Sequence, residues 1–133
     1  MKIKIVCVGK IKEKYLNEGI MEYLKRLQSY AQVEIIEVSE TKINDNPNAS
    51  QIKQVIDDEA SKMENYLNEK DYLIALDVKG KMINNQEYVS LIENAKLMGY
   101  SSFCFIIGGS YGLGLKLKEK CHFCWSLSKL VMT

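Results

Sequence analysis

The sequence predicts an α/β protein with one open, mostly parallel β-sheet and helices on both faces. The first reason is that short β-branched or apolar segments alternate with longer segments whose apolar residues recur at helical spacing, as in strands joined by crossover helices. The second reason is that residues 72–78 and 103–107 are almost continuously apolar, which is typical of strands covered on both faces. The 133 residues are enough for one domain with a core.

The first half of the chain predicts two strands and two helices in alternation. Residues 2–8 alternate lysine with isoleucine before becoming apolar, and residues 33–38 (VEIIEV) are β-branched, so both are predicted strands. Residues 13–30 and 50–68 are predicted helices, and Ser50 is the expected N-cap of the second one. The stripes expected to face the core are Leu16, Ile20, Tyr23, Leu24 and Leu27 in the first helix, and Ile52, Val55, Ile56, Met63 and Leu67 in the second.

The second half predicts two buried strands, a third helix and a glycine-rich loop. The predicted elements are a strand at 72–78 (YLIALDV), a turn at 79–81 (KGK), a helix at 87–98, a strand at 103–107 (FCFII), the loop GGSYGLG at 108–114, a short lysine-bearing helix, and a strand-like piece at 121–127. The chain contains no internal repeat or linker, so it is interpreted as a single domain.

Composition and charge are those of an ordinary globular domain, with 47% hydrophobic and 26% charged residues. The net charge is +1, but it is unevenly distributed: residues 1–31 and 79–133 are basic, and residues 32–78 are acidic. The uncharged run 97–115 raises the question of a membrane span, but its glycines favour a buried strand leading into a loop. Because no secretory signal is visible, a cytoplasmic protein with free thiols is expected. The four cysteines are Cys7, Cys104, Cys121 and Cys124.

Two strand ends are the places where the sequence favours a bound ligand. Ligands of open α/β sheets bind beyond the carboxyl ends of the strands, which here are residues 76–80 and 107–114. Glycines in the second segment allow a ligand to approach the backbone, whose N–H groups can act as donors. No P-loop is present, because Leu115 stands where that motif has lysine. The segment therefore indicates either a small ligand held near the backbone or a tight strand-to-helix turn.

The CxxC motif at Cys121 and Cys124 raises the possibility of a thiol or zinc site. A structural zinc needs four ligands, and His122 lies between the two cysteines, where it cannot easily join the same tetrahedron. A packed strand with buried thiols is the favoured interpretation, with His122 packed or hydrogen-bonded rather than catalytic.

Charged side chains fall into two groups with different expected roles. The acidic group is expected on solvated helix faces, and the basic group comprises candidate phosphate contacts or ordinary surface charges. The acidic group is Asp57, Asp58, Glu59 and Glu64; the basic group is Lys10, Lys12, Lys14, Lys116, Lys118 and Lys120.

Several motifs, taken in order, resemble those of one known family. They are MKI and VGK near the start, EYLKRL at 22–27, LDVKGK at 76–81, FIIGGSYGL at 105–113 and WSLSKL at 125–130. Over essentially the whole chain they look like the large-subunit ribosomal RNA methyltransferase H family. The specific part of the resemblance is the combination of LDVKGK, IIGGSYGL and the downstream SLSKL.

The resemblance implies an S-adenosylmethionine-dependent enzyme of the SPOUT superfamily, which has an α/β fold with a C-terminal trefoil knot and acts as a homodimer. The implied reaction is methylation of N3 of a pseudouridine in the 23S rRNA of the assembled 70S ribosome, with no metal and no membrane involved. Carried over by motif, the cofactor contacts are Leu76, Gly108 and a segment around the knot crossing whose backbone would hold the adenine. That segment is Leu127, Ser128, Lys129, Leu130, Val131 and Met132.

This sequence departs from the family pattern at its end. It has Val131, Met132 and Thr133 where family members more usually have Thr, then Phe or Leu, then Pro. Family members continue with a Pro-His-Gln-like motif and an arginine-bearing helix. The single domain, residues 1–133, is therefore expected to be truncated at its C-terminus with an incomplete knot, and no catalytic base is identified. Two other functions stay open: a non-catalytic ribosome- or RNA-binding α/β module, and a thiol or zinc protein that uses Cys121 and Cys124.

Overall fold

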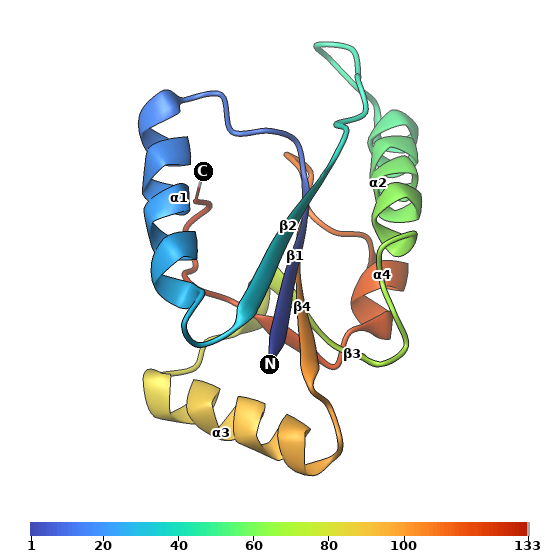
Figure 1. Ribbon diagram of the computed structural model, residues 1–133. Helices are drawn as coiled ribbons and strands as arrows, with labels where there is room; N and C mark the ends of the chain where they lie inside the picture. The colour runs from blue at the N-terminus through green and yellow to red at the C-terminus, as the bar shows by residue number, and fades with distance from the viewer. Residues whose placement is uncertain (133) are drawn as a thin grey trace.

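The computed structural model, which describes residues 1–132, contains one sheet of five parallel strands (Figure 1). The strands follow the order β2-β1-β4-β3-β5, so β4 lies between two strands that precede it in the chain. Their bounds are β1 Lys2–Val8, β2 Gln32–Val38, β3 Asp71–Lys81, β4 Ser102–Ile107 and β5 Phe123–Trp125. The predicted α/β class is confirmed, and every pairing between these strands is parallel.

Four helices cover the two faces of the sheet. Their bounds are α1 Lys14–Leu27, α2 Ala49–Glu64, α3 Asn85–Leu97 and α4 Leu115–Lys120. Figure 1 shows α1 and α3 on one side of the sheet and α2 and α4 on the other. On the α2 side, Met63 and Leu117 join Val6 and Ile106 in one buried cluster. On the α3 side, Ile92 and Ala95 pack with strand residues in a second cluster, so the sheet is buried on both faces at its centre.

Helix α1 is less buried than its apolar stripe predicts. Ile20 and Leu24 are half-buried, whereas Leu16, Tyr23 and Leu27 are exposed. The reason is that α1 lies over β2 at the edge of the sheet, where no further strand extends the apolar surface below it. The expectation that all five side chains face the core is therefore wrong for three of them.

Several predicted boundaries differ from the structure, and two of the differences have a clear physical cause. Helix α2 is capped by Asn48, not by Ser50: Asn48 Oδ1 accepts from the Gln51 N–H at 2.8 Å, and Gln51 Oε1 accepts from the Asn48 N–H at 2.9 Å. Strand β3 continues through the predicted turn at residues 79–81, with an irregularity between Leu76 and Lys81 where it pairs with β5. A Cβ on Gly80 would lie 2.6 Å from the Cys124 carbonyl oxygen, so only glycine lets the two backbones approach this closely.

A buried ionic cluster joins the amino ends of the central strands. Asp71, which begins β3, accepts from Lys4 Nζ of β1 at 2.9 Å and from Ser102 Oγ of β4 at 2.7 Å. The Asn68 N–H donates to the same carboxylate at 3.2 Å. Burial by itself would raise the pKa of Asp71, but the hydrogen bonds from Lys4 and Ser102 outweigh it and hold the pKa below its usual value.

The uncharged run 97–115 divides among the end of α3, strand β4, the glycine loop and the first residue of α4. No helix within residues 1–132 has both the length and the apolar character needed to cross a bilayer.

Candidate cofactor-binding site

Strands β4 and β5 end at the same level of the sheet, one on each side of Leu76 in β3, which continues to Lys81. In the register, Leu76 of β3 lies beside Ile107 of β4 on one side and beside Trp125 of β5 on the other. Gly108 directly follows Ile107, and Ser126 directly follows Trp125. The structure therefore brings together Leu76, Gly108 and the start of the C-terminal segment, which are far apart in the sequence.

The glycine loop after β4 folds tightly on itself. The Gly112 N–H donates to the Gly109 carbonyl at 2.9 Å, and Gly112 has a φ of +79°, which favours glycine. A Cβ on Gly108 would lie 2.7 Å from the Gly112 carbonyl carbon. Leu113 anchors the loop in the core, while Ser110 at its tip is exposed. Backbone N–H groups that such a loop does not use internally can serve as donors to a ligand.

The segment after β5 is shaped by two serines. Buried Ser126 donates from its N–H to the Lys81 carbonyl at 3.0 Å and from its Oγ to the Ser128 carbonyl at 2.9 Å. Ser128 Oγ in turn accepts from the Leu130 N–H at 3.0 Å. From this turn the chain continues in the direction in which the strands point (Figure 1). Leu130, at 75% exposure, and its exposed neighbours Val131 and Met132 leave an uncovered apolar surface beside the strand ends.

An ion pair fixes the backbone just beyond Leu76. Asp77 Oδ2 accepts from Lys118 Nζ of α4 at 2.8 Å, and Asp77 Oδ1 accepts from the Lys79 N–H at 3.1 Å. Burial alone would raise the pKa of Asp77, but these two hydrogen bonds outweigh it and lower the pKa. Lys118 is thus held in a structural contact, and β3 is tied, one residue after Leu76, to the helix that follows the glycine loop.

Glu59 is buried, contrary to the expectation that the acidic run of α2 is solvated. Asp57 and Asp58 are exposed, whereas Glu59 is 2% exposed and lies against Gly109 of the glycine loop. The helical spacing contained the signal: Glu59 is four residues from Val55 and four from Met63, and both of these face the core. Charge alone, which predicts exposure for every residue of the acidic group, is a poor guide at this position.

His122 is packed and hydrogen-bonded, as the sequence analysis favoured. Its ring stacks on Tyr72 with centroids 4.6 Å apart, its Nδ1 accepts from the Leu73 N–H at 2.9 Å, and its Nε2 lies 3.1 Å from Tyr100 Oη. Because Nδ1 is an acceptor, the tautomer carries its hydrogen on Nε2, which donates to Tyr100. These contacts lie toward the amino half of β3, away from the strand ends that carry the candidate site.

The four cysteines are free thiols. Burial raises the pKa of Cys104 and of Cys121 to about 12, so both are weak nucleophiles and weak metal ligands near neutral pH. Within residues 1–132, no three histidine, cysteine, aspartate or glutamate side chains are grouped so that they could hold a metal ion. The packing and protonation of these thiols give no support to the thiol or zinc hypothesis.

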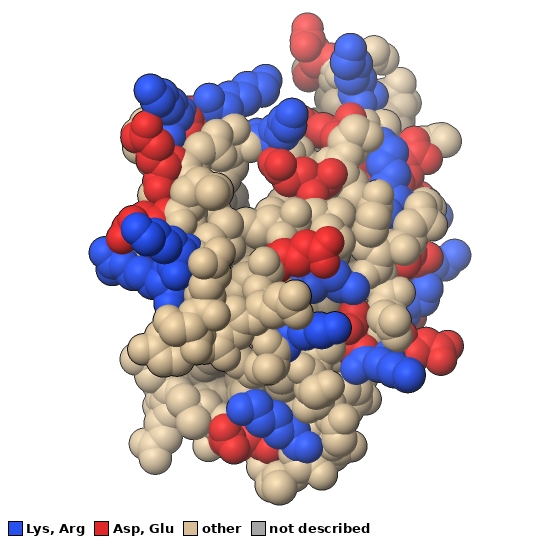
Figure 2. All heavy atoms as spheres, in the orientation of Figure 1, with Lys and Arg blue, Asp and Glu red and all other residues tan. Residues whose placement is uncertain are grey.

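The lysines considered for phosphate contacts are partly engaged in ion pairs. Besides Lys118, Lys120 pairs with Glu64 at 2.9 Å and Lys14 approaches Glu18 at 3.8 Å. On the face shown in Figure 2, basic and acidic side chains are interspersed and do not form one basic patch. Any nucleic-acid contact on that face therefore depends on individual lysines rather than on a continuous positive field.

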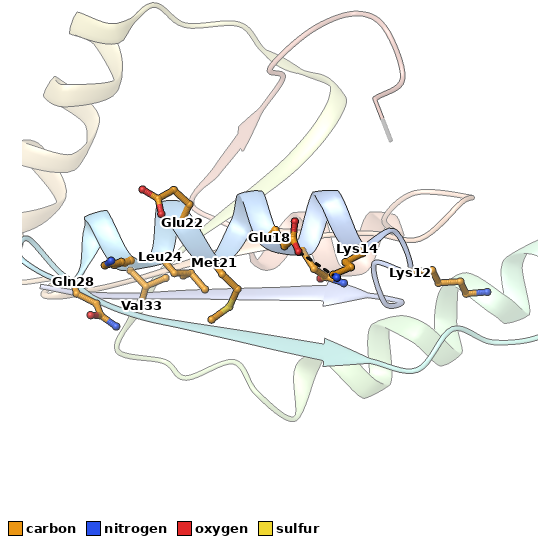
Figure 3. A pocket seen from close by; sticks show the side chains of 10 residues that line it. Lys12, Lys14, Glu18, Met21, Glu22, Leu24, Gln28 and Val33 are labelled. Atoms are coloured by element: carbon orange, nitrogen blue, oxygen red, sulfur yellow. Dashed lines mark ion pairs between the residues drawn. The ribbon is translucent and has the colours of Figure 1, made fainter.

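A groove of about 810 Å³ lies elsewhere, between α1 and β2 (Figure 3). Met21, Leu24 and Val33 line it, with charged side chains such as Lys12 and Glu22 around them. This groove is open along the side of the edge strand β2, and no residue of the glycine loop lines it. We therefore place the candidate site at the strand ends, where three backbone segments converge.

The arrangement at the strand ends fits a cofactor with a planar aromatic base and a polar chain. Exposed apolar side chains (Ile107, Leu127 and Leu130) can cover a planar base, and loop N–H groups can bind polar atoms. Of the residues expected to hold such a group, Leu76 lies beside Ile107, which Gly108 follows, and beside Trp125, which lies two residues before Leu127. No metal ligand is needed for this kind of binding.

Comparisons with known proteins identify the family. A family model described as "Predicted SPOUT methyltransferase" matches residues 1–133. The ribosomal RNA large subunit methyltransferase H of Streptococcus uberis is 42% identical over 132 residues, covering 99% of this chain and 83% of that protein. The protein of the same name from Streptococcus agalactiae serotype III is 38% identical with the same coverage, and that of Streptococcus thermophilus is 42% identical over 92% of this chain and 77% of its own length. The whole-chain match and these identities show that the chain belongs to the SPOUT methyltransferase family.

Proposed function

We propose that this methyltransferase modifies large-subunit ribosomal RNA and takes its methyl group from S-adenosylmethionine. The relatives' names support the substrate class. The observation that carries the cofactor assignment is the register that places Leu76 beside Ile107 and Trp125, because it brings three backbone segments to one edge of the sheet. In this proposal, Leu76, Gly108 and the segment from Leu127 to Met132 bind the cofactor.

The bound cofactor supplies a methyl carbon made electrophilic by its sulfonium group. Leu76, Gly108 and residues 127–132 would hold S-adenosylmethionine, which would supply its methyl group to a nitrogen of the RNA and keep the electron pair of the carbon–sulfur bond on sulfur, while the N–H proton of the nucleotide would pass to water. The protein contributes mainly by holding both reactants in line, and such positioning accounts for several kcal/mol or more of a barrier, roughly 7–11 kcal/mol in the best cases.

The proposal extends to the target and the assembly. The target is N3 of a pseudouridine in the 23S rRNA of the assembled 70S ribosome, which places the protein in the cytoplasm. The net charge of +1 suits a folded particle better than free RNA, because weak electrostatics limits non-specific binding. The homodimer and the trefoil knot belong to the same proposal. A second copy of the chain would cover the apolar side chains that are exposed on α1 (Met21 and Tyr23) and after β5 (Leu130).

The test uses the full-length protein with labelled S-adenosylmethionine and unmodified 70S ribosomes. We expect cofactor binding in calorimetry, a methyl group on one pseudouridine by mass spectrometry of digested 23S rRNA, and a dimer by light scattering. Gly108→Ala should weaken cofactor binding, because its Cβ would collide with the Gly112 backbone, whereas Gly19→Ala on α1 meets nothing within 4 Å and serves as the control.

Two results would contradict the proposal. Binding to ribosomes without any affinity for S-adenosylmethionine would support the non-catalytic module instead. Cofactor binding without methyl transfer to ribosomes or 23S rRNA would refute the substrate assignment.

A further inference from the structure

Glu59 holds the one buried side-chain oxygen or nitrogen within residues 1–132 that has no hydrogen-bond partner. This atom is Oε1, and the residue is 2% exposed. The other oxygen, Oε2, accepts from the Thr41 N–H of the loop after β2 at 3.2 Å. An unpaired carboxylate oxygen in a buried position is costly, because it has lost its water without gaining a donor.

Glu59 Oε1 points at the glycine loop. A Cβ on Gly109 would lie 2.8 Å from Oε1, 3.3 Å from Oε2 and 3.1 Å from Val8 Cγ1. The φ of Gly109 is not in the positive region, so its backbone conformation is open to other residues. A side chain at this position would have to displace the Glu59 carboxylate, which occupies the space that its Cβ would fill.

We propose that Glu59 is a positioning residue for the cofactor site: when S-adenosylmethionine is bound, Glu59 Oε1 accepts a hydrogen bond from a backbone N–H of the glycine loop while Oε2 keeps its bond from Thr41. This inference rests on the proposed function, since it concerns the loop that binds the cofactor. A carboxylate suits the role because both of its oxygens are acceptors. A glutamine amide at this position has only one acceptor oxygen. Its NH₂ group would face the N–H of either the loop after β2 or the glycine loop, and two donors cannot form a hydrogen bond.

The charges around Glu59 come from two elements. Burial raises the pKa of Glu59 most; the Thr41 N–H lowers it, Glu40 raises it, and Lys62 and Asp58 on α2 have smaller opposing effects. Lys62 Nζ is bound to the Ser39 carbonyl and Thr41 Oγ1, both at 3.1 Å, so it stabilises the same loop without pairing with Glu59. From the other side Glu59 meets Gly109 and Val8, which carry no charge. Glu59 should therefore become protonated at a higher pH than an ordinary glutamate.

The first experiment compares Glu59→Gln with the wild type in the full-length protein. We expect the dissociation constant and the KM for S-adenosylmethionine to rise about tenfold, as for the loss of one charged hydrogen bond, with kcat at saturating cofactor changed by no more than about twofold. Wild-type affinity should fall as the pH is lowered through the raised pKa of Glu59, and this fall should be absent in Glu59→Gln. Asp57→Asn, an exposed carboxylate one helical half-turn away, is the matched control and should behave as wild type.

The second experiment tests the contact itself by a double-mutant cycle. Gly109→Ala should weaken cofactor binding because its Cβ would meet Glu59 Oε1. In the Glu59→Ala background the same substitution should cost much less, because the collision partner is gone. Thermal unfolding of each variant separates loss of the site from loss of the fold.

The outcomes distinguish this inference from the proposed function. If the wild type does not bind S-adenosylmethionine, both fail. If the wild type binds it and Glu59→Gln binds equally well with the same pH profile, or if the two substitutions in the cycle are additive, the positioning role of Glu59 is refuted while the proposed function stands.

Discussion

Asp71 is the residue on which the amino ends of three central strands depend. Its side chain is almost fully buried, and its contacts with the half-buried Lys4 of β1 and Ser102 of β4 are short. Removing one partner of such a network leaves the others desolvated, so Asp71→Asn should lower the free energy of unfolding at pH 7 by about 2–4 kcal/mol. The measurement is urea denaturation, with the exposed Asp45→Asn as the control that should change stability little.

The same residue gives a pH dependence with a definite sign. Because the folded-state pKa of Asp71 lies below its ordinary value of 3.8, its stabilising contribution is complete above that value and is lost as the pH falls through the folded-state pKa. Acidification from pH 5 to pH 2 should therefore destabilise wild type more than Asp71→Asn. Parallel acid unfolding curves for the two proteins would contradict this assignment.

Two glycines should respond to alanine in opposite directions. Gly80→Ala should destabilise the protein by about 1–3 kcal/mol, the range for overpacking, because its Cβ would lie within 2.9 Å of three backbone atoms of β5. Gly19→Ala, inside α1 with nothing within 4 Å, should stabilise it by about 0.5–1 kcal/mol through helix propensity. Thermal midpoints that shift in the same direction for both variants would show that local packing at Gly80 does not control the β3–β5 contact.

At the scale of the element, the start of α2 tests the capping assignment. Asn48→Ala removes a side-chain acceptor and breaks the reciprocal pair with Gln51, so it should cost about 1 kcal/mol of stability. Ser50→Ala should be nearly neutral, because Ser50 lies inside the first turn and alanine is the better helix former. Chemical denaturation of both variants decides between the two caps; a larger loss for Ser50→Ala would reverse the assignment.

The element boundaries show what the sequence could and could not predict. The capping box was readable, since Asn48 has glutamine three residues later whereas Ser50 has Lys53. The continuation of β3 through Lys79 and Gly80 was not, because two lysines around a glycine are typical of a turn and become strand only through pairing with β5. Local patterns identify elements, but contacts made far along the chain decide where they end.

At the scale of the whole molecule, the α/β class followed from periodicity and the parallel arrangement from the alternation of strands and helices. The strand order did not follow, because it depends on non-local pairing. Leu76 and Gly108 were marked by their place at predicted strand ends, and the register puts Leu76 beside Ile107, the residue before Gly108. Glu59 was missed because its charge was weighed above its helical spacing from Val55 and Met63, and its contact with the glycine loop is non-local.

The position of β4 has a consequence for how this protein is made. Lys2 pairs with Ser102, so the central pairing of the sheet joins positions one hundred residues apart in the chain. During synthesis, β1, β2 and β3 leave the ribosome before β4 exists, and the facing edges of β1 and β3 stay without the strand that joins them. High sequence separation between contacting strands slows folding and prolongs exposure of unpaired edges. The centre of the sheet is thus among the last parts to close, and the strand ends that carry the candidate site come together only after nearly the whole chain has been translated.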